Sequence, residues 1–135
     1  MQMDDREREE AIIRLNRAIE KDDGVEKALW EAVKAFRKET FFTSGRGSRP
    51  GLPFSYDIKV SNRTGEETDE LVIDRRGHSK SITRSTVWLG YCNGREEQQR
   101  AGFVKGPKKL GCFGASYLYP LFIRLGLFQK SPSLD

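Results

Sequence analysis

The chain has 135 residues, a length that fits one domain with a core of ordinary size. Its composition is 36% hydrophobic and 33% charged with both signs well represented, which excludes a disordered chain. The net charge of +4 permits binding to polyanions without requiring it, because small basic domains also use such charge for solubility. Residues 1–43 hold 9 basic and 11 acidic side chains, whereas residues 44–135 hold 15 basic and 9 acidic side chains. We therefore expect any polyanion to meet the second part of the chain.

Cysteine usage and the apolar runs indicate where such a protein works. Cys92 and Cys112 are too few for a disulfide framework or a zinc site. Both lie among apolar neighbours, which predicts two buried free thiols in a reducing compartment, the cytoplasm; a single bridge between them is the alternative. The run YLYPLFI is too short to span a bilayer and MQMDDREREE is too charged for an export signal, so we expect no membrane partner.

The first forty residues predict two amphipathic helices. Ile12, Leu15 and Ile19 recur at steps of three and four in the first. The second has the clearest stripe in the chain, at i, i+3, i+4, i+7, i+8 and i+11, formed by Val25, Ala28, Leu29, Ala32, Val33 and Phe36. We expect Asp22 or Asp23 to cap the second helix. A single longer helix running through Gly24 is the alternative.

The middle of the chain predicts a basic loop followed by a hairpin. Residues 44–54 are rich in glycine, proline and arginine, which is typical of a loop. Residues 55–60 alternate between apolar and polar side chains, the period of a half-buried strand. Residues 71–74 form a second short strand, and residues 61–70 form the polar connection between them.

The last third of the chain predicts helices. Residues 81–100 read as a helix with Ser81 as its N-cap, although residues 86–93 also suit a strand. A short helix is expected from Pro107 to about residue 112, then a break near Gly114. A second helix should begin with Ser116 as N-cap and end before residue 126. The apolar residues of this segment have helical spacing and are Leu110, Phe113, Tyr117, Leu118, Leu121, Phe122 and Leu125.

These elements predict an α+β fold in a single domain over residues 1–135. Its parts are N-terminal amphipathic helices over residues 1–40, the loop 44–54, an α+β part over residues 55–128 and a tail over residues 129–135. The α+β part combines a small antiparallel hairpin or sheet with C-terminal helices.

The run DRRGHSKSITRST, residues 74–86, is the main candidate for a site. If a helix begins at Ser81, its first N–H groups have no partner within the helix and can bind an anion. The surrounding side chains would add charge and hydrogen-bond donors. The charged candidates are Arg75, Arg76, Lys80 and Arg84, and the donors are His78, Ser79, Ser81 and Thr83. The alternative is an ordinary strand-to-helix loop with a satisfied N-cap.

Two further basic runs could contact the same polyanion. Arg46 and Arg49 lie in GRGSRPG, which lacks the Gly-Lys-Ser/Thr of a P-loop and suits a flexible basic loop. The run VKGPKKLG adds Lys105, Lys108 and Lys109. The two C-terminal helices have the outline of a helix-turn-helix, but the second is too apolar to read base edges, so we expect it to pack in the core.

The sequence therefore favours a non-enzymatic binding protein that contacts phosphate groups, with DNA or RNA as the expected partner and without a cofactor, metal ligand or catalytic residue. The first alternative is an assembly module that dimerises or binds a protein through the N-terminal helices. The second is a metal-dependent nuclease built around Asp57 and Lys59. Its partner carboxylate would come from Glu31, Glu39, Glu70 or Asp74.

Overall fold

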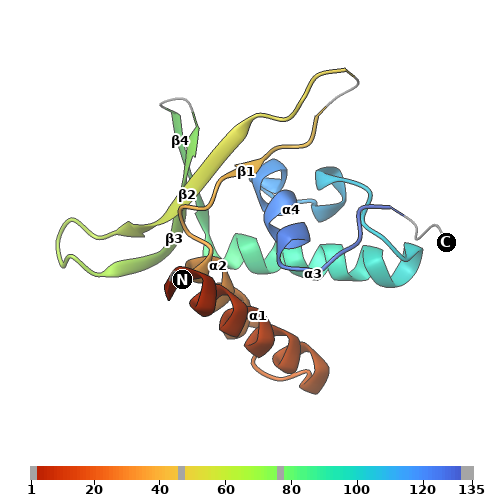
Figure 1. Cartoon of the computed structure of the whole chain (residues 1–135), viewed down its shortest axis with the longest axis horizontal. Coiled ribbons are helices and arrows are strands. Elements are labelled where there is room, and N and C mark those ends of the chain that lie inside the picture. Colours follow the sequence, from red (N-terminus) through yellow and green to blue (C-terminus); the bar gives the residue numbers. More distant parts are fainter. Residues whose placement is uncertain (1–2, 46–47, 76–77, 132–135) are drawn as a thin grey trace.

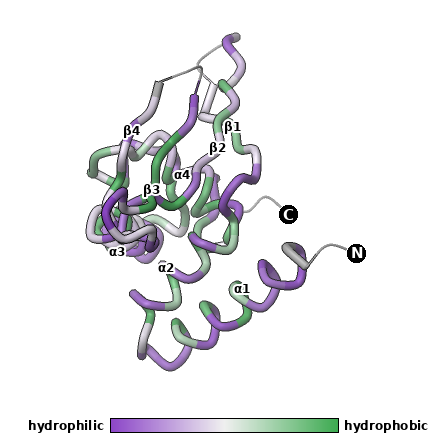
Figure 2. The backbone as a smooth tube through the Cα atoms, turned by 90° about the vertical axis from the view of Figure 1, so that its left-hand side faces the viewer, coloured by the Kyte–Doolittle hydropathy of each residue, from purple (hydrophilic) through white to green (hydrophobic). Residues whose placement is uncertain are grey.

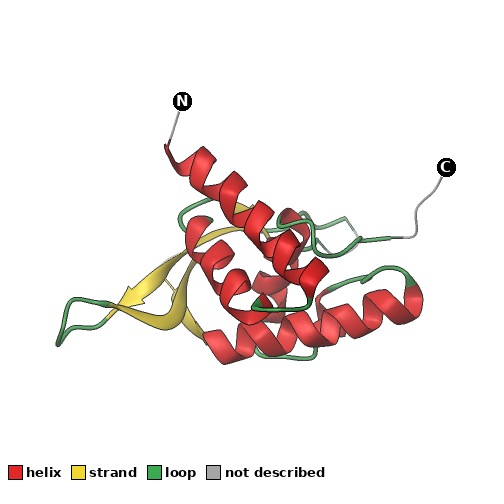
Figure 3. Cartoon of the chain, turned by 90° about the horizontal axis from the view of Figure 1, so that it is seen from below, coloured by secondary structure: helices red, strands yellow, loops and turns green. Residues whose placement is uncertain are grey.

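The computed structural model describes residues 3–45, 48–75 and 78–131, which form helices beside an antiparallel sheet (Figure 1). In chain order the elements are α1 (Met3–Lys21), α2 (Val25–Ala35), β1 (Phe41–Phe42), β2 (Pro53–Val60), β3 (Glu67–Arg75), β4 (His78–Thr83), α3 (Arg84–Ala101), the 3-10 turn η1 (Pro107–Leu110) and α4 (Ala115–Arg124). The sheet order is β1-β2-β3-β4, and Figure 3 shows the strands extending to one side of the helices. The predicted α+β class is confirmed.

Two separate N-terminal helices are present, but neither predicted aspartate caps α2. The N-cap is Gly24 in the left-handed conformation with φ 70°, and no side chain caps the helix. Asp22 and Asp23 instead close α1, because their N–H groups donate to the carbonyls of Ile19 and Ala18. The aspartates therefore end the first helix and do not start the second.

The apolar stripe of α2 is buried inside the molecule. Its buried members are Val25, Leu29, Ala32, Val33 and Phe36. Figure 2 shows α1 as the outermost helix, packed on α2 and polar over much of its length. On α1, Ala11 and Leu15 are buried and Ile13 is 49% exposed. The stripe that suggested an assembly role is thus covered by the chain's own core.

The strands β2, β3 and β4 alternate between a buried inner face and a polar outer face. The inner face carries Phe54, Tyr56, Ile58, Leu71, Ile73 and Ile82, all in the core. The hydroxyl of Tyr56 donates to the carbonyl of Val33 at 2.7 Å and so joins the sheet to α2. Burial raises the pKa of this hydroxyl well above its ordinary value. The predicted hairpin is confirmed, and β3 begins earlier than expected, at Glu67.

The predicted start of the helix at Ser81 is wrong. Residues 78–83 form a further strand, in which Ser81 pairs with Val72 and Ile82 with Leu71. In this strand the side chain of Ile82 is buried in the core. The helix begins at Arg84, and its N-cap is Thr83, whose hydroxyl accepts from the N–H of Thr86. Residues 86–93 are helical, as we expected.

Close packing of the C-terminal elements on α3 depends on two glycines one helical turn apart. A methyl group added at Gly94 would lie 2.5 Å from ring carbons of Phe128, and one added at Gly90 would lie 2.9 Å from Sγ of Cys112.

Cys112 and Cys92 are free thiols, partly rather than fully buried, and burial raises the pKa of each.

The α4 helix begins one residue before the predicted cap. Its N-cap is Gly114 at φ 75°, so Ser116 lies inside the helix and caps nothing. Gly114 sits against the side chain of Ile82, where a Cβ atom has no room. Pro120 is tolerated within the helix, although it leaves the carbonyl of Ser116 without its usual donor. No helix in the described ranges is long and apolar enough to cross a bilayer.

Gly94→Ala should lower the stability of the protein. Replacing a helical glycine by alanine normally stabilises the folded state by about 1 kcal/mol. Overpacking against the buried ring of Phe128 destabilises it by about 1–3 kcal/mol. Urea unfolding followed by circular dichroism measures the net effect. In a Phe128→Leu background the penalty should shrink, because the shorter side chain makes room. A Gly94→Ala protein more stable than the parent would contradict this account of the contact.

Candidate nucleic-acid interface

The candidate interface lies at the end of the β3–β4 hairpin. Side chains on one face of a strand are two residues apart, so Arg75 follows Ile73 on the inner face and Lys80 precedes Ile82 there. In the strand pairing Arg75 lies opposite His78, so Lys80 is the diagonal neighbour of Arg75. The Cα atoms of such diagonal neighbours are about 7–8 Å apart. The two cations therefore continue the inner face beyond the edge of the core.

The first turn of α4 faces these two cations across a pocket, which we call the hairpin pocket. It is lined by Ile73, Arg75, Ser79, Lys80, Ser116 and Tyr117. The ammonium of Lys80 lies 5.3 Å from the ring centre of Phe113 and 6.0 Å from that of Tyr117, which holds it toward α4 by cation–π attraction. The ring of Phe113 is 58% exposed.

No carboxylate lines the hairpin pocket. Among the described residues, neither Arg75 nor Lys80 forms an ion pair with an Asp or Glu. Moreover, α4 begins without a side-chain cap, so the positive end of its dipole adds to the local field. Two cations, Ser116 and a helix start therefore meet in one place, a combination suited to a phosphate group.

Arg84 does not belong to this cluster. Its guanidinium pairs with both carboxylate oxygens of Glu26 at 2.8 Å and approaches Asp69 at 3.4 Å. The hydrogen bond from Arg84 lowers the pKa of Glu26, and the same bond raises the pKa of Arg84. The chain's own carboxylates thus occupy the region before α3 where we expected an anion, because α2 brings Glu26 to the end of β4.

The remaining predicted donors of this run separate. Ser79 and Ser81 both lie on the outer face of the sheet, opposite Asp74 and Val72, although Ser79 also borders the hairpin pocket. The hydroxyl of Thr83 caps α3. His78 takes part in β4 through its backbone, but its side chain lies outside the described part, as does all of Arg76.

The predicted cations of the other two runs are dispersed. Arg49 is exposed in the segment between β1 and β2. Figure 1 shows that segment and the β3–β4 hairpin protruding from the same end of the molecule. Arg46 lies outside the described residues. Lys105 and Lys108 are exposed elsewhere, and Lys109 lies 3.9 Å from Glu97.

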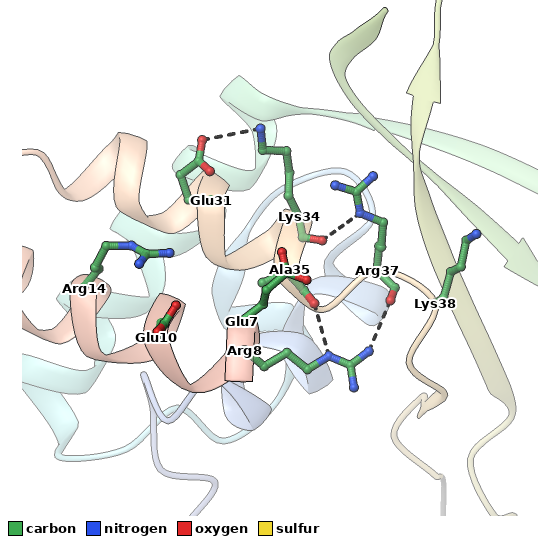
Figure 4. Close-up of a pocket in the computed structure, with 9 residues that line it drawn as sticks. All are labelled: Glu7, Arg8, Glu10, Arg14, Glu31, Lys34, Ala35, Arg37 and Lys38. Atoms are coloured by element: carbon green, nitrogen blue, oxygen red, sulfur yellow. Dashed lines mark hydrogen bonds and ion pairs between the residues drawn. The ribbon is translucent and has the colours of Figure 1, made fainter. Parts of the chain in front are cut away.

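A second group of cations, between α1 and α2, serves the fold. In Figure 4 the guanidinium of Arg8 donates to the carbonyls of Ala35 and Arg37, and Arg37 donates to the carbonyl of Lys34. These bonds satisfy carbonyls at the end of α2. Lys34 also pairs with Glu31 at 3.4 Å. These cations line a pocket between α1 and α2 that also contains glutamates, so it suits a polyanion less than the hairpin pocket does.

The nuclease hypothesis gains no support from the geometry. Asp57 and Lys59 lie on the outer face of β2, where Asp57 is 3.7 Å from Lys38 and Lys59 is 4.0 Å from Glu70. Within residues 3–45, 48–75 and 78–131, no three His, Cys, Asp or Glu side chains are grouped so that they could hold a metal ion.

Sequence reasoning left Phe113 and Ser116 out of the site. It took Tyr117 as a core residue, with stacking on an unpaired base as the alternative. The helical spacing placed Phe113 in an apolar stripe, but the chain turns at Gly111 and Gly114, both with positive φ, and the ring is left outside. The available signal was the pair of glycines on either side of this phenylalanine in GCFG.

Comparison with known proteins gave no match: no protein-family model, no curated protein and no solved structure resembles the chain at a significant level. The interface is therefore interpreted from its geometry alone.

Glu26→Gln should destabilise the protein in a pH-dependent way. The hydrogen bond from Arg84 places the folded-state pKa of Glu26 below its ordinary value of 4.5. The ion pair therefore stabilises the fold fully above the ordinary value, and this effect is lost as the pH falls through the lower folded-state pKa. The stability difference between the parent and Glu26→Gln, measured by urea unfolding, should be largest near neutral pH and shrink in acid. Glu20→Gln, an exposed carboxylate on α1, is the control. A difference independent of pH would contradict the ion pair.

Proposed function

We propose that the protein is a non-enzymatic nucleic-acid-binding protein that contacts phosphate groups through the hairpin pocket. The observation that carries the proposal is the position of Arg75 and Lys80. They share one face of adjacent strands, and no carboxylate among the described residues pairs with either. Several cations elsewhere in the described chain are paired with acids, including Arg8, Arg84 and Arg124.

The chemistry of the pocket fits a phosphodiester. A guanidinium offers a planar fork of donors and an ammonium offers a compact charge, and both recur at phosphate sites. The hydroxyl of Ser116 is a further donor, while the exposed segment with Arg49 projects from the same end of the molecule (Figure 1). Such contacts give affinity rather than base selectivity, so we expect weak sequence preference.

The double variant Arg75→Ala/Lys80→Ala should bind a fluorescent oligonucleotide much more weakly than the parent. Each lost phosphate contact should also lower the slope of log affinity against log salt by about 1. Fluorescence anisotropy from about 50 to 200 mM salt measures both quantities.

The matched control is Arg17→Ala/Lys27→Ala, which removes the same two residue types from exposed positions on α1 and α2. Circular dichroism checks that both variants fold. If the control loses as much affinity as the pocket variant, binding reflects net charge alone and the hairpin pocket is not the site.

A further inference from the structure

The outer face of α4 connects the hairpin pocket to a second pocket at the other end of this helix. The helix buries Tyr117, Leu118, Leu121 and Phe122. Its opposite side presents Ser116, Pro120 and Ile123, spaced at i, i+4 and i+7 and not buried. A ten-residue helix is about 15 Å long, so this face is a short track with a pocket at each end.

The second pocket, which we call the Phe42 pocket, is likewise lined by no acidic side chain of the described residues. Its lining residues are Phe42, Thr43, Ser44, Gly45, Tyr119, Pro120, Ile123, Arg124 and Lys130. Arg124 is paired with Glu39 at 2.9 Å, which leaves Lys130 as the cation without a pair among the described residues. By contrast, the pockets between α1 and α2, along α3 and in front of α3 each contain glutamate.

Each end of the track carries an exposed phenylalanine. Phe113 is 58% exposed beside the hairpin pocket, and Phe42 is 59% exposed in the other. Phe42 is held in place by its strand pairing with Pro53 and by the bonds between Thr43 and Leu52 that follow it. Neighbouring Phe41 points the other way and is buried in the core. Both rings are therefore presented to solvent by ordered backbone.

We infer that the ligand is a single-stranded nucleic acid that lies along the outer face of α4 and stacks bases on Phe113 and Phe42. This inference rests on the proposed function. Cations beside exposed aromatic rings are the combination that binds unpaired strands, because phosphates meet charge and bases meet a ring. A duplex keeps its bases stacked on one another, so it offers these rings nothing to stack on.

The test compares one labelled oligonucleotide, single-stranded and annealed to its complement, by fluorescence anisotropy. The single strand should bind more tightly than the duplex. Phe113→Ala and Phe42→Ala should each weaken single-strand binding by roughly 5- to 150-fold and leave duplex binding nearly unchanged. Leu89→Ala, which removes a 49% exposed side chain on α3 that lines neither pocket, should change neither.

A strand containing 2-aminopurine gives an independent readout, since stacking quenches its emission. Quenching should be strong with the parent and reduced in both phenylalanine variants.

Salt-dependent binding that is equally strong for the single strand and the duplex, and unchanged by both phenylalanine variants, would overturn this inference while the proposed function stands. A loss confined to one ring would overturn the track along α4. Absence of salt-dependent binding to either nucleic acid would overturn the proposed function as well.

Discussion

Burial of the inner face of the sheet against α2 and α4 is the constraint on which the rest of the structure depends. Phe54 packs edge-on against Tyr117 at a ring separation of 5.0 Å, and Tyr56 reaches the end of α2 through its hydroxyl. Because strand side chains alternate, the face that carries this core also carries whatever follows it along β3 and β4. Arg75 and Lys80 follow it, and they meet the start of α4 because α4 already covers the core beside them. The candidate site is thus a continuation of the core packing.

Pairing within the chain decides which cations remain available to a ligand. Arg84 is held by Glu26, and Glu39 pairs with Arg8 and Arg124, whose guanidinium groups both also lie near the ring of Phe36. These pairs tie helices and strands that are distant in the sequence. The two pockets at the ends of α4 are lined by no acidic side chain of the described residues.

The geometry bears unequally on the three functions that the sequence left open. The apolar stripe of α2 is buried in the core, so an assembly role would need a different surface. Asp57 lies among Arg37 and Lys38, and Arg37 also pairs with Glu67, but in the described part no three His, Cys, Asp or Glu side chains are grouped to hold a metal ion. The phosphate-binding hypothesis rests on Arg75 and Lys80, which pair with no carboxylate in the described part of the chain. These cations are not at the helix start that first suggested it.

The sequence by itself determined the elements whose signal is local. The stripe over residues 25–36 and the alternation over residues 55–60 are periodic patterns that suit one kind of backbone, and both predictions are confirmed. Only the tertiary structure decided the fate of residues 78–84. Their one large apolar residue, Ile82, and their hydroxyl side chains fit a strand or a capped helix equally well, and pairing with β3 selects the strand. The charge excess of the second half was likewise visible in the sequence, but the cations that stay unpaired depend on which carboxylates approach in space. Glu26 reaches Arg84 from 58 residues away, a contact that no local pattern encodes.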